Sequence, residues 1–371
     1  MTNVFIIVNS PGEIEGWLKP VVKELKNLDF NILITVFIPP CRYSSDEECN
    51  IIKGISEVDN VVAPKDFIIY IIFSKINVEI NKTDKGVIVF LGGDIIYGLL
   101  LKLKTKWPLI AYTMSFKPWP WSIFVNKYFT KKEIGNLMID AFYKEGENTS
   151  IEEKTNKIKK IMLFSGSRKQ HFKPFLPLLA SSAKIIKEKH PYIKVYLRIS
   201  PYINKCLRDK ALAEIDTKNI IIIKEENKNS FKDIDLLVTL PGTSTIEAAV
   251  QGIPMIVVLP FNKPELIEYD GLLGALSNIP FIKRYLKMII LYLANKFTKF
   301  IALPNIEANS LIVPELRKKI NEFELAKEII SLVNDDIKLL EMKKNLRKIF
   351  SRAGASKIFS KEITNLLRET K

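Results

Sequence analysis

One segment in the second half of the chain constrains the fold most strongly. Residues 234–239 form a short apolar run, Ile-Asp-Leu-Leu-Val-Thr, which is typical of a buried strand and is interrupted by Pro241-Gly242. Residues 243–250 then have the pattern of a helix, and residues 255–259 form a second apolar run. A strand, a glycine turn, a helix and another strand in this order are typical of a parallel sheet covered by helices.

The turn in this segment has the chemistry of an anion site. Gly242 is followed by the hydroxyl residues Thr243, Ser244 and Thr245 at the expected start of the helix. Backbone N–H groups without partners and the positive end of the helix dipole at such a position suit a phosphate. Glu247, one turn further on, suits a ribose diol. Ser244 and Glu247 also fit a capping box, in which both side chains only satisfy backbone donors, and the segment alone leaves both interpretations open.

The same alternation of strands and helices continues on both sides of this segment, and 371 residues are enough for two domains. The predicted fold class is therefore α/β, with two Rossmann-like domains whose parallel sheets face a central cleft. The charge-rich stretch 146–160 is the best linker. We expect an N-terminal domain at residues 1–150, a C-terminal domain at residues 158–335, and helices at residues 340–371 that pack back onto the first. Further strands are expected at residues 4–8, 32–38, 87–91, 109–112, 160–164, 194–199 and 220–223.

Glycine turns follow four of the expected strands. In open parallel sheets, ligands bind beyond the carboxyl ends of the strands. Turns at these ends are therefore expected to line one cleft, and residues 9–16, between the first strand and the first helix, are expected to form a loop. The four turns are Pro11-Gly12, Gly92-Gly93, Ser165-Gly166 and Pro241-Gly242.

Composition narrows the function classes. The 3 cysteines have no metal spacing and imply no disulfide framework, and the 2 histidines cannot form a histidine metal site by themselves. The formal net charge of +15 fits scattered solvated lysines or attraction to an anionic membrane or lipid phosphate. We expect no nucleic-acid partner, because no recognisable module accompanies the charge. We also expect no signal peptide, since residues 3–9 form a core strand, and no apolar stretch reaches the ~18 residues of a membrane-spanning helix.

Several blocks, in order, resemble the lipid-A-disaccharide synthase family of GT-B glycosyltransferases. The Gly-Ser-Arg turn and the Leu-Pro-Asn-Ile and Val-Pro-Glu blocks are the most specific, and the N-terminal half matches more loosely. The resemblance runs from the first strand to about residue 316. The blocks that carry it are residues 10–16 (Ser-Pro-Gly-Glu-Ile-Glu-Gly), 90–94 (Phe-Leu-Gly-Gly-Asp), 135–140 (Gly-Asn-Leu-Met-Ile-Asp), 163–168 (Leu-Phe-Ser-Gly-Ser-Arg), 241–255, 301–306 (Ile-Ala-Leu-Pro-Asn-Ile) and 313–316 (Val-Pro-Glu-Leu).

The resemblance implies a GT-B fold and an inverting sugar transfer. That family moves a diacylglucosamine from a UDP donor to the 6-hydroxyl of a diacylglucosamine 1-phosphate and releases UDP. It needs neither a metal nor a cofactor, and it works in the cytoplasm at the inner face of the cytoplasmic membrane. The expected partners are therefore a UDP-sugar donor, a lipid-like acceptor and an anionic membrane surface.

The donor site follows from the same resemblance. Ser165, Gly166, Ser167 and Arg168 fit the stabilisation of the departing diphosphate, because an arginine can fork onto phosphate oxygens. Thr243, Ser244 and Thr245 add hydroxyl and N–H contacts, and Glu247 is assigned to the ribose. A surface turn with a solvated arginine is the alternative for the first group.

For the catalytic base, Asp94 is the first choice and Glu13 the alternative. Asp94 follows a buried strand and a Gly-Gly pair, so we expect it to point into the cleft, where partial burial of a carboxylate can raise its pKa. The alternative role for Asp94 is the N-cap of a following helix. Gly12, Gly93 and Asn136 are expected on the acceptor side.

The sequence departs from the family pattern mainly in this acceptor half. Tyr97 and Trp17 stand where the family has aspartates, Asn136 replaces its histidine, and His171 replaces the glutamate after Gly-Ser-Arg. The resemblance therefore supports the donor site more specifically than the acceptor site. These departures keep open a non-catalytic relative that binds UDP-sugar or lipid, and the fold also accommodates a sugar-nucleotide epimerase.

Two apolar segments have two interpretations each. Aromatic residues and prolines gather in residues 107–124, where Trp107, Trp119 and Trp121 suit a membrane interface or acyl chains as well as a packed core turn. The basic amphipathic segment 282–300 suits an anionic lipid surface or the interface of a homodimer. The basic character of the whole chain favours the membrane role.

Overall fold

The computed structural model describes residues 2–28, 31–41, 47–75, 85–114, 120–143, 158–224, 231, 233–263, 266, 292–293 and 295–369. These residues form two compact units. Unit 1 comprises Met1–Tyr143 and Arg352–Lys371, and unit 2 comprises Lys144–Ser351. Each unit is described separately below.

Unit 1 is built on a six-stranded parallel sheet with the strand order β3-β2-β1-β4-β5-β6. The central strands are almost continuously apolar, as expected for a sheet that helices cover on both faces. The sharp break in strand order falls between β1 and β4, which pair directly. The strands are β1 Thr2–Ile7, β2 Ile32–Phe37, β3 Asn60–Val62, β4 Gly86–Phe90, β5 Leu109–Thr113 and β6 Lys127–Thr130.

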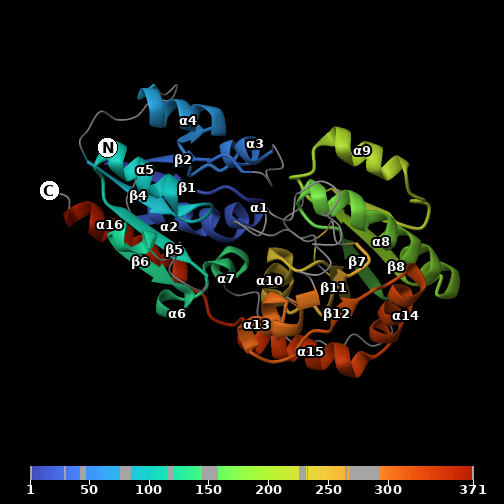
Figure 1. Cartoon of the computed structure of the whole chain (residues 1–371). Helices are drawn as coiled ribbons and strands as arrows, with labels where there is room; N and C mark the ends of the chain where they lie inside the picture. The colour runs from blue at the N-terminus through green and yellow to red at the C-terminus, as the bar shows by residue number, and fades with distance from the viewer. Residues whose placement is uncertain are drawn as a thin grey trace. The chain divides into compact units, whose positions relative to one another are not determined.

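The helices of unit 1 include the last one in the chain. In Figure 1 the red helix α16 lies among the blue and cyan elements of the first unit, although it is the last helix in the sequence. The helical segments are α1 Pro11–Glu13, the π-helix η1 Ile14–Leu18, α2 Lys19–Leu28, α3 Glu48–Lys53, α4 Pro64–Phe73, α5 Ile95–Thr105, the 3-10 helix η2 Trp121–Phe124, α6 Lys131–Ile134, α7 Leu137–Phe142 and α16 Ala355–Glu369.

Asp140 attaches α16 to the rest of unit 1. Its Oδ1 accepts a hydrogen bond from the Gly354 backbone at 3.0 Å, and its Oδ2 accepts from the Ser356 backbone at 2.7 Å and the Ser356 hydroxyl at 2.6 Å. Phe359 of α16 is fully buried and packs beside Tyr112 of β5, with ring centroids 5.9 Å apart. One carboxylate therefore holds the start of a helix that is more than two hundred residues away in sequence.

Unit 2 repeats the same architecture. Its six parallel strands have the order β12-β11-β10-β7-β8-β9, so β7 and β10 pair as β1 and β4 do in unit 1. The strands are β7 Lys160–Phe164, β8 Lys194–Ile199, β9 Ile221–Lys224, β10 Leu236–Thr239, β11 Met255–Pro260 and β12 Glu315–Lys318, and the helices are α8 Lys169–Lys189, α9 Lys205–Ala213, α10 Thr243–Val250, α13 Leu303–Ala308, α14 Glu322–Val333 and α15 Asp336–Ile349.

The structure confirms the predicted α/β class and the predicted strands, and it corrects three local expectations. Residues 9–16 are not a loop, because Pro11 begins a helix that continues through η1 into α2. The charged sequence Glu315–Lys318 forms edge strand β12, which periodicity did not reveal. The range 340–371 is divided: α15 packs against α10 and α14 of unit 2, and only α16 joins unit 1. Most of the expected linker lies outside the described residues.

Candidate functional site

The two glycine turns of unit 2 leave the sheet at the same edge. Strands β7 and β10 are neighbours, and Phe164, the last residue of β7, pairs with Thr239, the last residue of β10. Both strands run in the same direction, so the turns that follow them emerge side by side. This is the position at which open α/β sheets bind ligands.

The first turn, Ser165 to Arg168, leads into α8. Gly166 has a φ of 96°, and a Cβ there would lie 3.0 Å from the Cβ of His171, so both backbone conformation and space favour glycine. Arg168 is the N-cap, and its side chain makes no capping hydrogen bond. The Ser165 side chain is fully buried, and its Oγ has no hydrogen-bond partner among the described residues. A buried hydroxyl of this kind is rare without a partner and indicates a missing polar group.

The second turn leads into α10 and excludes the capping-box interpretation. Gly242 is the N-cap, and no side chain in the described part of the chain caps the helix. The Ser244 hydroxyl instead lies 3.1 Å from the Thr239 hydroxyl, and Thr245 donates to the Gly242 carbonyl at 2.7 Å. A Cβ on Gly242 would meet nothing within 4 Å, so the turn is open on that side. The backbone donors of Thr243 and Ser244 are thus not taken by side-chain caps.

Glu247 binds an arginine that sequence reasoning did not select. Both carboxylate oxygens accept from Arg198 of β8, at 2.9 Å from Nη1 to Oε2 and 2.8 Å from Nη2 to Oε1. The Arg198 side chain is 5% exposed and that of Glu247 is 18% exposed. No local pattern joins residues that are 49 positions apart, although a charged residue in an apolar strand, Lys-Val-Tyr-Leu-Arg-Ile, was a signal that the arginine has a buried partner.

His171 packs beside Gly166 of the first turn, and its imidazole is neutral near pH 7. Burial lowers its pKa from 6.5 to about 4, the charge of Arg168 acts in the same direction, and a hydrogen bond to the Leu266 backbone opposes them. The residue therefore adds no positive charge to the turn near neutral pH. It fills the space beside Gly166 and leaves Arg168 as the cation of this turn.

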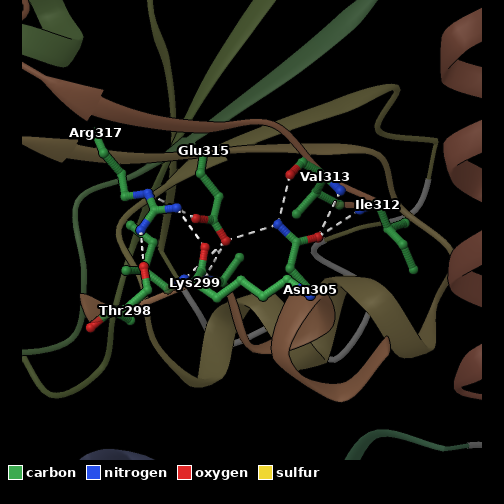
Figure 2. Close-up of polar contacts among 9 residues, drawn as sticks. Thr298, Lys299, Asn305, Ile312, Val313, Glu315 and Arg317 are labelled. Carbon is green, nitrogen blue, oxygen red and sulfur yellow. Dashed lines mark hydrogen bonds and ion pairs between the residues drawn. The ribbon is translucent and has the colours of Figure 1, made fainter. Parts of the chain in front are cut away.

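The Leu-Pro-Asn block forms a buried polar network beside α10 (Figure 2). Asn305 of α13 is fully buried; its Oδ1 accepts from the backbones of Ile312 and Val313, and its Nδ2 donates to the Val313 carbonyl and to Glu315. Glu315 also pairs with Arg317, which donates to the carbonyls of Thr298 and Lys299. Because α13 packs on α10, this network lies beside the helix that follows the second turn.

Glu13 of unit 1 caps a helix, whereas we expected it on a loop as the alternative base. Its Oε2 accepts from the backbones of Asn9 at 3.0 Å and Ser10 at 3.1 Å, forming a capping box at the helix that contains Gly12. A Cβ on Gly92 would lie 2.1 Å from the Glu13 carboxylate, so this carboxylate packs directly on the end of β4. Glu13 therefore occupies the donors that a ligand phosphate would need.

Asp94 is the N-cap of α5. Its Oδ1 accepts a hydrogen bond from the Ile96 backbone at 3.0 Å. We expected this carboxylate to be partly buried, but the residue is exposed. Gly93 before it has a φ of 88°, and a Cβ there would lie 2.9 Å from the Asn9 side chain. The structure thus brings Asp94, Gly93 and the Glu13 helix together at the carboxyl ends of β1 and β4, as the glycine turns predicted.

Three residues at which the chain departs from the family have structural roles in unit 1. Asn136 is 5% exposed and caps α7 through its Oδ1, whereas its Nδ2 has no partner among the described residues. Trp17 packs edge-on to Tyr112, with ring centroids 5.9 Å apart. Tyr97 packs on Phe67 at the edge of the core. The positions at which the family has aspartates here hold aromatic packing residues.

The two units, each a six-stranded parallel sheet of Rossmann order with helices, define a GT-B fold. Solved structures with a similar fold cover nearly the whole chain. The S. aureus MnaA-UDP co-structure matches with a TM-score of 0.55 and 14% identity over 99% of this chain and 97% of that one. Acinetobacter baumannii MurG matches with a TM-score of 0.51 and 12% identity over 98% and 100%. At these identities the likeness concerns the fold.

Sequence comparison finds similarity to lipid-A-disaccharide synthases. The model described as Lipid-A-disaccharide synthetase matches residues 118–263. Lipid-A-disaccharide synthase of Persephonella marina is 26% identical over 279 residues, which are 73% of this chain and 67% of that protein. The enzyme of Sulfurihydrogenibium sp. is 24% identical over 70% of this chain and 66% of its own length, and lipid-A-disaccharide synthase 1 of Legionella pneumophila is 25% identical over 53% and 45%. The chain is therefore similar in sequence to lipid-A-disaccharide synthases, at about a quarter of the aligned positions.

Proposed function

We propose that the protein is an inverting, metal-independent glycosyltransferase that moves an acylated glucosamine-type sugar from a UDP donor to a lipid-like acceptor. The observation that carries the proposal is the pair of adjacent turns in unit 2, in which the N-cap residues Arg168 and Gly242 make no side-chain cap, together with the buried Ser165 hydroxyl and Glu247. Relatives are named lipid-A-disaccharide synthases, and structures of the same fold are titled as complexes with UDP or UDP-GlcNAc.

In this proposal the diphosphate lies across the two turns of unit 2. Backbone N–H groups at the starts of α8 and α10 donate to its oxygens, Arg168 forks onto them, and Ser165 donates its hydroxyl. Glu247 accepts from the ribose hydroxyls. Fixed donors and one arginine would stabilise the charge of departing UDP without a metal ion.

Asp94 is proposed as the general base. Its Oδ1 accepts the cap hydrogen bond at the start of α5, so Oδ2 is the atom that would remove the proton of the acceptor hydroxyl. The acceptor oxygen then bonds to the anomeric carbon as the bond from that carbon to the UDP oxygen breaks. Glu13 remains the second choice, although its carboxylate already accepts two backbone hydrogen bonds.

Membrane association is proposed through an apolar patch on unit 1. The patch is formed by Ile72 and Phe73 of α4, Leu103 of α5, and Ile123 and Phe124 of η2, each at least 53% exposed. Monomeric proteins rarely expose such a group of large apolar side chains without a partner.

Lysines connect the elements of this apolar patch. Lys104 donates to the Ile71 carbonyl, and Lys102 donates to the Phe124 carbonyl. Apolar side chains next to lysines, in a chain of net charge +15, suit the cytoplasmic face of an anionic membrane.

Of the aromatic residues that suggested a membrane role, one is packed in the core and another is exposed. Trp107 is packed against Phe5 with ring centroids 4.7 Å apart, whereas Trp121 of η2 is 42% exposed. Trp119 and residues 282–291 lie outside the described residues, and of the following residues Tyr292 and Phe297 are exposed. No helix in the described ranges is long and apolar enough to cross a membrane.

The test is UDP release by the purified chain with a UDP-acylglucosamine donor and an acylglucosamine 1-phosphate acceptor in mixed micelles. We expect UDP release that depends on both substrates and persists in EDTA. Absence of both turnover and UDP binding by calorimetry would contradict the proposal. Conversion of UDP-GlcNAc without an acceptor would identify an epimerase instead.

A further inference from the structure

Arg198 of β8 lies beside the proposed donor site, although it belongs to neither of the two turns. It is the fifth residue of β8 and pairs in register with Phe164, the last residue of β7. Glu247 belongs to α10, which follows β10, on the other side of β7. The Arg198 side chain therefore crosses the end of β7, beside the turn that begins at Ser165.

The guanidinium contacts two aromatic rings and one carboxylate. Its Cζ lies 5.2 Å from the ring centroid of Phe164 and 4.6 Å from that of Phe231. Its two terminal nitrogens bind the two oxygens of Glu247 in a parallel fork. Stacking and a bidentate carboxylate are the interactions for which arginine is suited and lysine is not. The orientation of the Glu247 carboxylate is thereby fixed in the structure.

The fork leaves Glu247 able to accept further hydrogen bonds. An ionised carboxylate has about four acceptor sites, and the arginine uses one on each oxygen. The Glu247 side chain is 18% exposed and the Arg198 side chain is 5% exposed, so a ligand would reach the carboxylate and not the guanidinium. Without the arginine, a carboxylate here would be partly buried, uncompensated and free to rotate, next to a turn proposed to hold a diphosphate.

We infer that Arg198 is a positioning residue for nucleotide recognition: it orients the Glu247 carboxylate so that both oxygens accept from the 2′- and 3′-hydroxyls of a ribose. This inference rests on the proposed UDP site. It predicts that the contribution of Arg198 to binding appears only when the ligand carries the diol.

The test compares two ligands, UDP and 2′,3′-dideoxy-UDP, by calorimetry. The wild-type chain is expected to bind UDP about 10- to 100-fold more tightly, since hydrogen bonds to a charged group discriminate by that factor. Glu247→Gln should reduce this preference to about threefold or less. Arg198→Gln should reduce the preference to the same extent and change the affinity for the dideoxy ligand by less than about threefold.

Arg198→Lys is the matched variant. It keeps the positive charge, so Glu247 is not left alone, but it cannot form the fork. We expect it to fold with an unfolding midpoint close to wild type and to keep less than about a third of the preference for UDP. It keeps the inference testable if Arg198→Gln fails to fold.

The outcomes separate this inference from the proposed function. A folded Arg198→Lys or Arg198→Gln variant that retains the full preference would overturn the inference. An equal loss of affinity for both ligands would also overturn it, because that result indicates a structural role alone. Wild-type chain that binds UDP without preferring the diol contradicts the inference only, whereas wild-type chain that binds neither ligand contradicts the UDP site itself.

Discussion

The two units have the same strand order but use equivalent turns in opposite ways. In unit 1, the helix after β1 is capped by Glu13 and the helix after β4 by Asp94. In unit 2, the helices after β7 and β10 have the N-cap residues Arg168 and Gly242, which make no side-chain cap hydrogen bond. The same topology therefore produces one edge at which the protein's own carboxylates cap the helices and one edge at which the N-cap residues do not, which is the edge proposed to bind an anion.

This contrast teaches that a glycine turn at a strand end does not by itself define a phosphate site. All four predicted glycine segments follow the carboxyl ends of strands, although Pro11-Gly12 lies in α1 rather than in a turn. In unit 1 the side chains that follow the turns are acidic, so they cap the helices and repel an anion. In unit 2 they are hydroxyls, with Arg168 and the buried Ser165 beside them. The comparison leads to five predictions.

Asp94→Asn should have the largest effect. Asparagine is as good an N-cap as aspartate but a poor base, so turnover should fall about 10²- to 10⁴-fold while folding and UDP affinity stay unchanged. Asp94→Ala is the matched variant and should also lower the free energy of unfolding by about 1 kcal/mol. Steady-state kinetics and denaturant unfolding separate the two roles. An Asp94→Asn enzyme with wild-type turnover would show that Asp94 is only a cap.

His171 should make unit 2 sensitive to acid. Its pKa is about 4 in the folded protein and 6.5 in the reference state, so below pH 6.5 the unfolded chain binds more protons. Stability should be lost as the pH falls from about 6.5 to about 4, by about 3 kcal/mol in full. His171→Gln should remove this slope. The control is His190→Gln, the only other histidine in the sequence, which should leave it intact in unfolding measured between pH 4 and 7.

Arg168→Ala should weaken UDP binding about 10- to 100-fold, because a charge-assisted contact to the diphosphate is lost. Lys189→Ala, at the other end of the same helix, is the charge-matched control and should bind UDP as wild type does. Calorimetry at two salt concentrations measures both. Equal weakening in the two variants would indicate that general positive charge, rather than the turn, attracts the nucleotide.

Glu13→Ala should lower the free energy of unfolding by about 1–2 kcal/mol and leave UDP affinity unchanged, since it removes a capping box in the other unit. Glu13→Gln keeps an acceptor at this position and should lose less than half as much. If Glu13→Gln abolishes turnover while Asp94→Asn does not, then Glu13 is the base.

Ser165→Ala should have the smallest effect, and it should change stability and UDP affinity in opposite directions. Removing a buried hydroxyl without a partner should raise the free energy of unfolding by about 1 kcal/mol, whereas UDP affinity should fall about tenfold. Ser181→Ala, at an exposed position of α8, is the control for both measurements. A loss of stability without a loss of affinity would place Ser165 in the core packing alone.

Much of the fold was accessible from short-range patterns. Apolar runs of 4–8 residues separated by glycine turns and helical stretches predicted the interior strands of both sheets, including β7 and β10, whereas edge strands β3 and β6 were not among the expected strands. The turns at Ser165 and Gly242 were found because glycine and hydroxyl residues have local conformational preferences. Edge strand β12 was missed, because it is charged and half-exposed and so lacks the apolar run of a central strand.

Local patterns could not distinguish a cap from a site. Ser244 and Glu247 match a capping box in sequence, but α10 begins two residues earlier than that box requires, at Thr243, so the two side chains bind Thr239 and Arg198 instead. Glu13 was expected on a loop, and it caps a helix instead. The role of such side chains changes when the start of a helix moves by one or two residues, and that start depends on how the helix packs on the sheet.

The sequence by itself determined the two α/β units, the two glycine turns of unit 2 and the similarity to lipid-A-disaccharide synthases, because these reside in contiguous residues. Only the tertiary structure decided that Arg198 holds Glu247 across the end of β7, and that Asp140 ties α16 to unit 1. The physical reason is strand order: a parallel sheet places next to one another segments separated by tens to hundreds of residues. Pairing across such distances depends on buried geometry that no local run of residues encodes.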